Sequence, residues 1–210
     1  LDFALAAGER LAILGRNGAG KSTLLSALAG LRAPLAGEVR LKGISYNELG
    51  PRKAALIRGW LPQARNDAFA STVLETALVG RHPHLERWGW ESAQDARIVR
   101  QALASVGLAD FERRDIQTLS GGERQRLAIA RVLLKKPAWV LADEATSALD
   151  VPAEETLYAR LKAMTEQAGG ALLSIAHRPS VAAFHQRRWQ LVPQAGEARY
   201  RVQDEGLPAA

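Results

Sequence analysis

Short apolar segments alternate with helical patterns along this chain of 210 residues. Residues 11–14, 139–142 and 171–175 have the length and apolar composition of buried central strands, whereas residues 38–42 alternate between polar and apolar as an edge strand does. Strands that alternate with helices favour a parallel or mixed sheet flanked by helices. The pattern therefore predicts an α/β fold with a mixed sheet.

The sequence pattern of residues 65–118 is different and is typical of helices. Ser92 and Asp95 form a capping-box pattern before a helix that Gly107 can end. The apolar positions of this helix recur at helical spacing, at Ala96, Val99, Leu103 and Val106. We expect residues 65–118 to form an inserted helical subdomain between the core segments 1–64 and 119–195, followed by a polar tail at 196–210 whose last residues are loose.

A glycine-rich segment, GRNGAGKS at residues 15–22, links the first predicted strand to a Leu- and Ala-rich helix. In the spacing G-x-x-x-x-G-K-S, the glycines let backbone N–H groups approach phosphate oxygens, Lys21 reaches the β and γ phosphates, and Ser22 offers its hydroxyl to Mg²⁺. The helix that follows adds its positive N-terminal dipole. The motif predicts a P-loop that binds a nucleotide through Gly15, Arg16, Asn17, Gly18, Ala19, Gly20, Lys21, Ser22 and Thr23.

Two carboxylates, Asp143 and Glu144, follow the apolar strand in PAWVLADE, residues 137–144. By themselves they could equally be solvated acids at a strand end, but the upstream P-loop favours a catalytic interpretation. We expect Asp143 to hold Mg²⁺ through water beside Ser22, and Glu144 to polarise the water that attacks the γ-phosphate.

The segment LSGGERQR, residues 119–126, predicts a second anion site. Ser120 and Glu123 form a capping box, but capping does not require the glycines at 121 and 122, which cost about 1 kcal/mol each in a helix relative to Ala. The Ser120 hydroxyl and the bare amides of Gly121 and Gly122 would bind a phosphate at the helix N-terminus. Since the P-loop already binds one triphosphate, two copies pairing head to tail would place each nucleotide between both faces.

Composition narrows the class of protein. The formal net charge is +6, but the basic residues are scattered rather than gathered with aromatics, so no specific nucleic-acid partner is expected. The chain has no cysteine, no apolar run near the roughly 20 residues of a membrane helix, and no secretory signal. It begins without Met, almost within a strand, which suggests an excised or truncated fragment.

Over about residues 1–192, the chain resembles the nucleotide-binding domain of an ABC transporter, with the family signature at LSGGE. The resemblance implies a RecA-like P-loop NTPase core and an ATPase that uses ATP and Mg²⁺ to power solute transport. It further implies a transmembrane permease, a second copy of the ATPase domain and a solute-binding protein as partners. It places the protein peripherally at the cytoplasmic face of the inner membrane.

The same resemblance assigns roles to three further segments. Gln63, in WLPQ, would be the Q-loop glutamine that contacts Mg²⁺ and takes part in catalysis, and His177, in AHR, would be the switch histidine that contacts the γ-phosphate. Residues 147–150, SALD, resemble the D-loop that touches the opposite subunit. The family stacks adenine on an aromatic residue that would precede Leu1, so no adenine-stacking residue is assigned.

Two interpretations of the transport class stand side by side. Residues 72–90 resemble importers of iron chelates, haem or cobalamin, whereas residues 143–150 and 176–189 resemble exporter-type or peptide-uptake half-transporters. The alternative function is a soluble ABC-type ATPase acting on ribosomes or DNA. Such translation factors usually carry two motif sets, and the DNA-repair relatives place a long coiled coil between P-loop and signature, for which this chain has no room.

Overall fold

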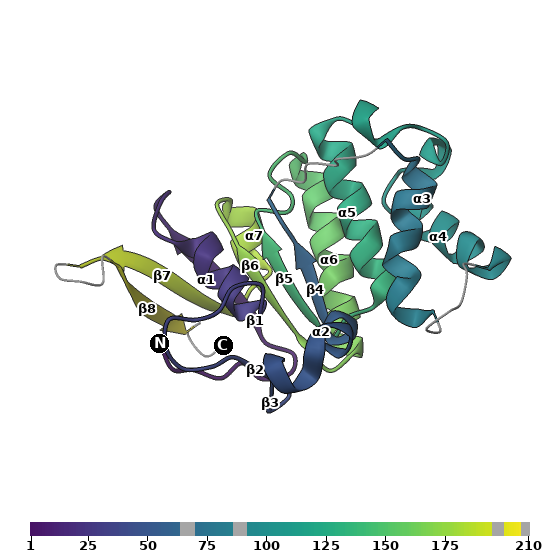
Figure 1. Cartoon of the computed structure of the whole chain (residues 1–210). Coiled ribbons are helices and arrows are strands. Elements are labelled where there is room, and N and C mark those ends of the chain that lie inside the picture. Colours follow the sequence, from purple (N-terminus) through teal and green to yellow (C-terminus); the bar gives the residue numbers. More distant parts are fainter. Residues whose placement is uncertain (64–69, 86–91, 195–199, 207–210) are drawn as a thin grey trace.

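The computed structural model describes residues 1–63, 70–85, 92–194 and 200–206. Its main sheet has the strand order β4-β5-β6-β1-β7-β8 (Figure 1). Neighbouring strands are parallel from β4 to β7, and only β8 runs antiparallel, to β7. The strands are β4 (Arg58–Leu61), β5 (Trp139–Asp143), β6 (Ala171–Ile175), β1 (Arg10–Gly15), β7 (Arg187–Pro193) and β8 (Tyr200–Gly206). The α/β fold with a mixed sheet and the three predicted central strands are confirmed.

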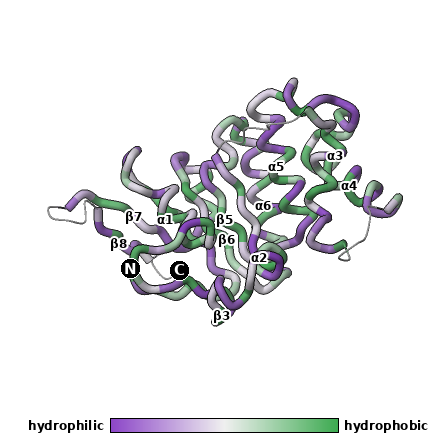
Figure 2. The backbone as a smooth tube through the Cα atoms, viewed as in Figure 1, coloured by the Kyte–Doolittle hydropathy of each residue, from purple (hydrophilic) through white to green (hydrophobic). Residues whose placement is uncertain are grey.

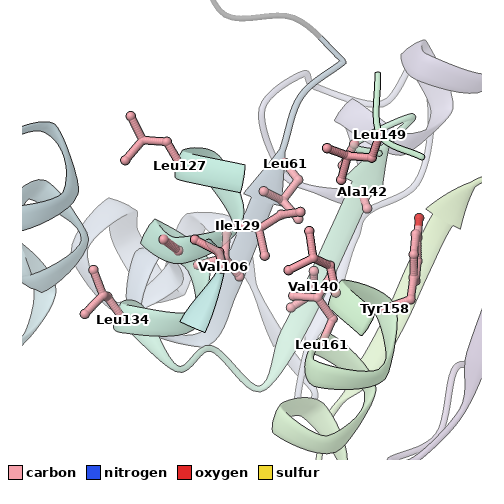
Figure 3. Packing of buried hydrophobic residues seen from close by; sticks show 14 of the residues in the cluster. Leu61, Val106, Leu127, Ile129, Leu134, Val140, Ala142, Leu149, Tyr158 and Leu161 are labelled. Carbon is pink, nitrogen blue, oxygen red and sulfur yellow. The ribbon is translucent and has the colours of Figure 1, made fainter. Parts of the chain in front are cut away.

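Alternate side chains of the central strands enter two separate cores, as the pleat of a strand requires. Leu11 and Ile13 of β1 pack in one cluster with Leu25 of α1 (Lys21–Leu28). Ala12 belongs to the opposite cluster, which contains side chains of α5 (Gly121–Lys135) and α6 (Val151–Gln167). Figure 3 shows this second cluster between the two helices and β5, and Figure 2 shows the hydrophobic inner strands. The sheet is therefore a central layer between α1 on one face and α5 with α6 on the other.

A group of helices extends from the sheet on the side of α5 (Figure 1). It contains α3 (Val73–Leu78), α4 (Ala93–Ser105) and three 3₁₀ turns, η1 (Val79–His84), η2 (Ala109–Phe111) and η3 (Ile116–Thr118). The predicted capping box of α4 is present, and the chain turns after the helix at Gly107, with φ 74°. Because α5 packs against α3, α4 and η1 as well as β4, it belongs to both parts, and the boundary at residue 119 stays a prediction. No helix in the described part of the chain is long and apolar enough to cross a membrane.

The strand expected at residues 38–42 is present but shorter, and it lies outside the main sheet. Of residues 38–42, only Arg40–Leu41 forms a strand, β2, and it pairs with β3 (Ile44–Ser45) in a separate two-stranded sheet. Positive φ angles at Lys42 and Gly43 make the tight two-residue turn that joins β2 to β3. The chain continues into α2 (Tyr46–Ile57).

The polar segment 196–210 is not a tail throughout, because β8 pairs with β7 along its whole length, and Arg187 forms an ion pair with Asp204 across them. Most side chains of β8 are exposed, so an apolar periodicity could not reveal it. The expectation that the last residues are loose concerns 207–210, which lie outside the described residues.

Candidate nucleotide-binding site

The carboxyl ends of four adjacent parallel strands form one edge of the sheet. β1 ends in the glycine-rich loop, β5 ends at Asp143, Gln63 follows β4 by two positions, and His177 follows β6 by two positions. Since parallel strands bring their carboxyl ends to the same edge, segments distant in sequence meet there. A cavity of about 570 Å³ lies at this edge and is lined by residues of all four segments, including Gly18, Lys21, Gln63, Glu144 and His177.

The loop after β1 has the backbone that the P-loop prediction requires. Gly18 and Gly20 have φ angles of 79° and 87°, a left-handed conformation that glycine adopts without a steric penalty. Lys21 is buried, and its Nζ donates hydrogen bonds to the carbonyl oxygens of Gly15 at 3.0 Å and Arg16 at 3.1 Å. An ammonium group has three N–H donors, so one remains for a ligand.

The N-terminus of α1 differs from those of the five helices that follow it. Helices α2 to α6 each begin with a Ser, Thr or Asp side chain that accepts a hydrogen bond from a first-turn amide. Helix α1 begins at Gly20 without such a cap and without an acidic residue in its first turn. Its free N–H groups and positive dipole end are therefore available to an anion in the cavity.

Asp143 and Ser22 form an oxygen-rich pair, and Ser22 lines the cavity. The Ser22 hydroxyl donates to Asp143 Oδ1 at 3.1 Å. Burial raises the pKa of the Asp143 carboxyl above its ordinary value; the hydrogen bond from Ser22 opposes this rise, and the nearby charge of Glu144 adds to it. A hydroxyl and a buried carboxylate are ligands that suit Mg²⁺, and a cation would stabilise the charged carboxylate that burial disfavours.

Glu144 lies at the centre of the polar contacts in the cavity. Gln63 Nε2 donates to Glu144 Oε2 at 2.8 Å, and His177 Nε2 lies 2.5 Å from Glu144 Oε1. Because a carboxylate only accepts, His177 contributes the proton to this contact. Glu144 has a φ of 47°, a left-handed conformation that costs a non-glycine residue roughly 1–3 kcal/mol and that persists only where the surroundings enforce it.

The structure brings the P-loop, Asp143, Glu144, Gln63 and His177 together, but it does not bring Ser120, Gly121 and Gly122 to them. Those three begin α5, with Ser120 as its N-cap in the predicted capping box, and none is among the described residues that line the cavity. A Cβ on Gly122 would lie 3.1 Å from the carbonyl oxygen of Ala148, so the predicted D-loop packs directly on this turn. Close packing is thus a second reason for a glycine at position 122, one that the sequence did not indicate.

Three polar residues near the cavity were also missed. Thr146, Glu154 and Arg178 line it, but their partners are mostly each other and the backbone of residues 147–149. Their only sequence signal was the position of Arg178 directly after His177. Phe3 packs edge-on against Trp189, with ring centroids 4.4 Å apart, and the described lining contains no aromatic residue.

Comparisons with known proteins give matches over most of the chain. A family model described as ABC transporter matches residues 1–147. The chain is 39% identical over 216 aligned positions to the hemin import ATP-binding protein HmuV of Myxococcus xanthus, covering 100% of this chain and 78% of the relative. It is 38% identical over 205 residues to HmuV of Burkholderia thailandensis, covering 90% and 75%. Among solved structures, a dimeric ATP-binding cassette in a post-hydrolysis state with ADP and Pi is 28% identical, with a TM-score of 0.83, covering 99% of this chain and 89% of that one.

Proposed function

The chain belongs to the ABC transporter family as an ATP-binding and ATP-hydrolysing subunit, and from this premise we propose that it drives import of a hemin-class solute through a partner permease. The observation that carries the catalytic part is the convergence of Gln63 and His177 on the Glu144 carboxylate beside the P-loop. The alternative, a soluble ATPase acting on ribosomes or DNA, is not favoured, because the relatives above are import proteins.

Binding of the triphosphate is assigned to the P-loop. The uncapped N-terminus of α1 and the spare N–H of Lys21 supply donors for its oxygens. Ser22, Asp143 and Gln63 would hold Mg²⁺, which, when bound, neutralises charge on the phosphates. Burial of Asp143 in this donor set supports the assignment.

The hydrolytic step is assigned to Glu144. Its carboxylate accepts a hydrogen bond from Gln63 beside the P-loop, and there it would accept a proton from the attacking water. His177, released from Glu144 when nucleotide enters, would contact the γ-phosphate.

Pairing of two copies completes the site in this proposal. Ser120, Gly121 and Gly122 lie away from the cavity of their own chain, so they would reach the nucleotide of a second copy. ATP would then favour the closed pair, because only the closed pair offers the γ-phosphate both sets of donors, and hydrolysis would remove that preference. The dimeric state of the solved ATP-binding cassette supports this arrangement.

The solute and its direction are assigned from the relatives. Both are named hemin import ATP-binding proteins, and residues 72–90 resemble importers of the same class. Import of this kind would involve a permease and a solute-binding protein, with the ATPase attached peripherally to the inner face of the membrane. The exporter-like resemblance of residues 143–150 and 176–189 would then reflect the shared ATPase machinery rather than direction.

Two measurements test the proposal. Purified protein should hydrolyse Mg·ATP, and Glu144→Gln should lower turnover about 10²–10⁴-fold. Glu155→Gln, a change at an exposed residue of α6, should leave turnover intact. In cells lacking the gene, the wild-type protein but not Glu144→Gln should restore growth on hemin as iron source. An active ATPase that does not restore growth on hemin would contradict hemin as the solute. Equal turnover by wild type and Glu144→Gln would contradict the catalytic role of Glu144.

A further inference from the structure

Arg178 connects the segment of His177 to the D-loop, residues 147–150. One guanidinium nitrogen donates to the carbonyl oxygen of Leu149 at 2.7 Å, and the other terminal nitrogen donates to that of Ser147 at 2.9 Å. A planar guanidinium group can bind two fixed acceptors at once, which a lysine ammonium on its flexible stem does less well. The side chain thus spans two carbonyls of one loop.

Glu154 supports the same connection from α6. Its side chain is 1% exposed and accepts hydrogen bonds from Thr146 Oγ1 at 2.8 Å and Ser180 Oγ at 2.6 Å, with Arg178 at 3.5 Å. Thr146 follows β5 and Ser180 follows β6, so one buried carboxylate joins the segments that leave the two strands. A buried, fully partnered carboxylate is a weak source of stability compared with an apolar side chain, so its value here lies in fixing positions.

The loop itself continues directly from Glu144. The Ser147 amide donates to the Glu144 carbonyl oxygen at 3.1 Å, and the Leu149 amide donates to that of Thr146 at 3.0 Å. Leu149 enters the core next to Ala142 (Figure 3). Residues 144–149 therefore form a continuous turn, and Glu144, its first residue, has the left-handed backbone.

These contacts close a ring. The Glu144 carboxylate contacts His177, the next residue is Arg178, and Arg178 holds the carbonyl of Ser147, which is bonded back to Glu144. We propose that Arg178, supported by Glu154, is a positioning residue for hydrolysis that holds the 144–149 turn so that Glu144 keeps its orientation toward the reacting water. This inference rests on the proposed role of Glu144.

Loss of the Arg178 side chain should slow hydrolysis without weakening the binding of ATP. Arg178 has no hydrogen bond to residues 15–23 in the described structure, so its loss should leave the phosphate donors in place. Without it, the Glu144 backbone can relax toward a commoner conformation and move the carboxylate, and a displacement of about 1 Å can cost roughly 100-fold in rate. We expect Arg178→Ala to lower kcat about tenfold or more while the dissociation constant for ATP changes less than twofold.

The experiment compares variants of the full chain by steady-state ATPase kinetics, nucleotide titration and thermal unfolding. Arg178→Lys should retain part of kcat, because an ammonium can keep one of the two carbonyl bonds, and it also serves if Arg178→Ala does not fold. Arg100→Ala is the matched control: Arg100 is an exposed arginine of α4 paired with Glu112 and distant in sequence from both loops. It should behave as wild type.

A double variant tests whether Arg178 acts through Glu144. If it does, adding Arg178→Ala to Glu144→Gln should lower the residual turnover less than twofold. Unchanged kcat in Arg178→Ala, a proportional loss of kcat and ATP affinity, or a full additional loss in the double variant would each overturn the inference. An inactive wild-type protein would instead refute the proposed function, so the two failures are distinguishable.

Discussion

Substitution of the two signature glycines by alanine should separate helix propensity from loop packing. Gly121 and Gly122 occupy the first turn of α5, and either change removes a residue that costs a helix up to about 1 kcal/mol relative to Ala. A Cβ on Gly121 would lie 3.5 Å from the Ala148 Cβ, an ordinary contact. A Cβ on Gly122 would lie 3.1 Å from the Ala148 carbonyl oxygen and 3.4 Å from Leu149 Cδ2, which is tight.

The change in stability that each substitution causes depends on whether the D-loop can move away from the new Cβ. Gly121→Ala should stabilise the protein by up to about 1 kcal/mol, or roughly 2–4 °C in melting temperature for a chain of this size. Gly122→Ala has the same helix gain, but it must displace a loop that Gln125 and Arg178 hold through hydrogen bonds. Overpacking of a fixed neighbour costs about 1–3 kcal/mol, so Gly122→Ala should melt roughly 2–12 °C below Gly121→Ala.

The assay is thermal unfolding of both variants and wild type without nucleotide, with urea unfolding to obtain free energies. Equal melting temperatures for the two variants, or a higher one for Gly122→Ala, would refute the close packing of the D-loop on α5. Adding Gln125→Ala, which frees the Ala148 amide and the Ser147 hydroxyl from α5, should reduce the difference. A difference that persists undiminished would mean that the loop is held by something other than these bonds.

Three further predictions concern charge. Lys21→Ala should weaken ATP binding about 10–100-fold, as expected for lost hydrogen bonds from a charged donor, and an unchanged affinity by calorimetry would contradict the P-loop assignment. Glu144→Gln should bind ATP normally while turnover falls about 10²–10⁴-fold, and light scattering with Mg·ATP should show a trapped dimer rather than monomers. Hydrogen bonds from Ser92, and then from Arg81, lower the pKa of the Asp95 carboxyl from 3.8 to about 2. The charged carboxylate therefore stabilises the fold above pH 4. This stabilisation is lost as the pH falls toward 2. The melting difference between wild type and Asp95→Asn should therefore shrink over that interval; a constant difference would argue against the shifted pKa.

The central part of the fold could be predicted from the sequence because its strands are buried on both faces. β1, β5 and β6 are apolar at almost every position, and a covered parallel sheet requires that composition. β8 could not be found in this way, because it lies at the sheet edge with mostly exposed side chains and pairs through its backbone. The β2–β3 hairpin is only two residues per strand, too short for a period-of-two pattern to define.

Part of the candidate site could also be predicted from the sequence, and part could not. The P-loop and the acids at the end of β5 are recognisable because their chemistry fixes residue types at fixed spacings. The structure places Glu144 on the same cavity as the P-loop and joins Asp143 to Ser22 by a hydrogen bond. Gln63 and His177 were assigned by their order relative to family motifs, and the contacts of both with Glu144 became visible only in three dimensions. Arg178 had no such signal, because it binds backbone carbonyls, and every residue has one.

The glycine pair of the signature segment illustrates how one sequence feature can have two physical causes. Its cost to the helix implies a compensating benefit, and bare amides for a phosphate were one explanation, but the approach of Ala148 to Gly122 supplies another within a single copy. Gly122 alone is therefore weak support for a nucleotide shared between two copies. Stronger support comes from the separation of the two predicted phosphate sites. Helix α1 presents an uncapped N-terminus to the cavity. Ser120 and its glycines begin α5 and are not among the described residues that line the cavity. Because these amides do not line the cavity of their own chain, a phosphate that they bind would belong to a nucleotide on another molecule.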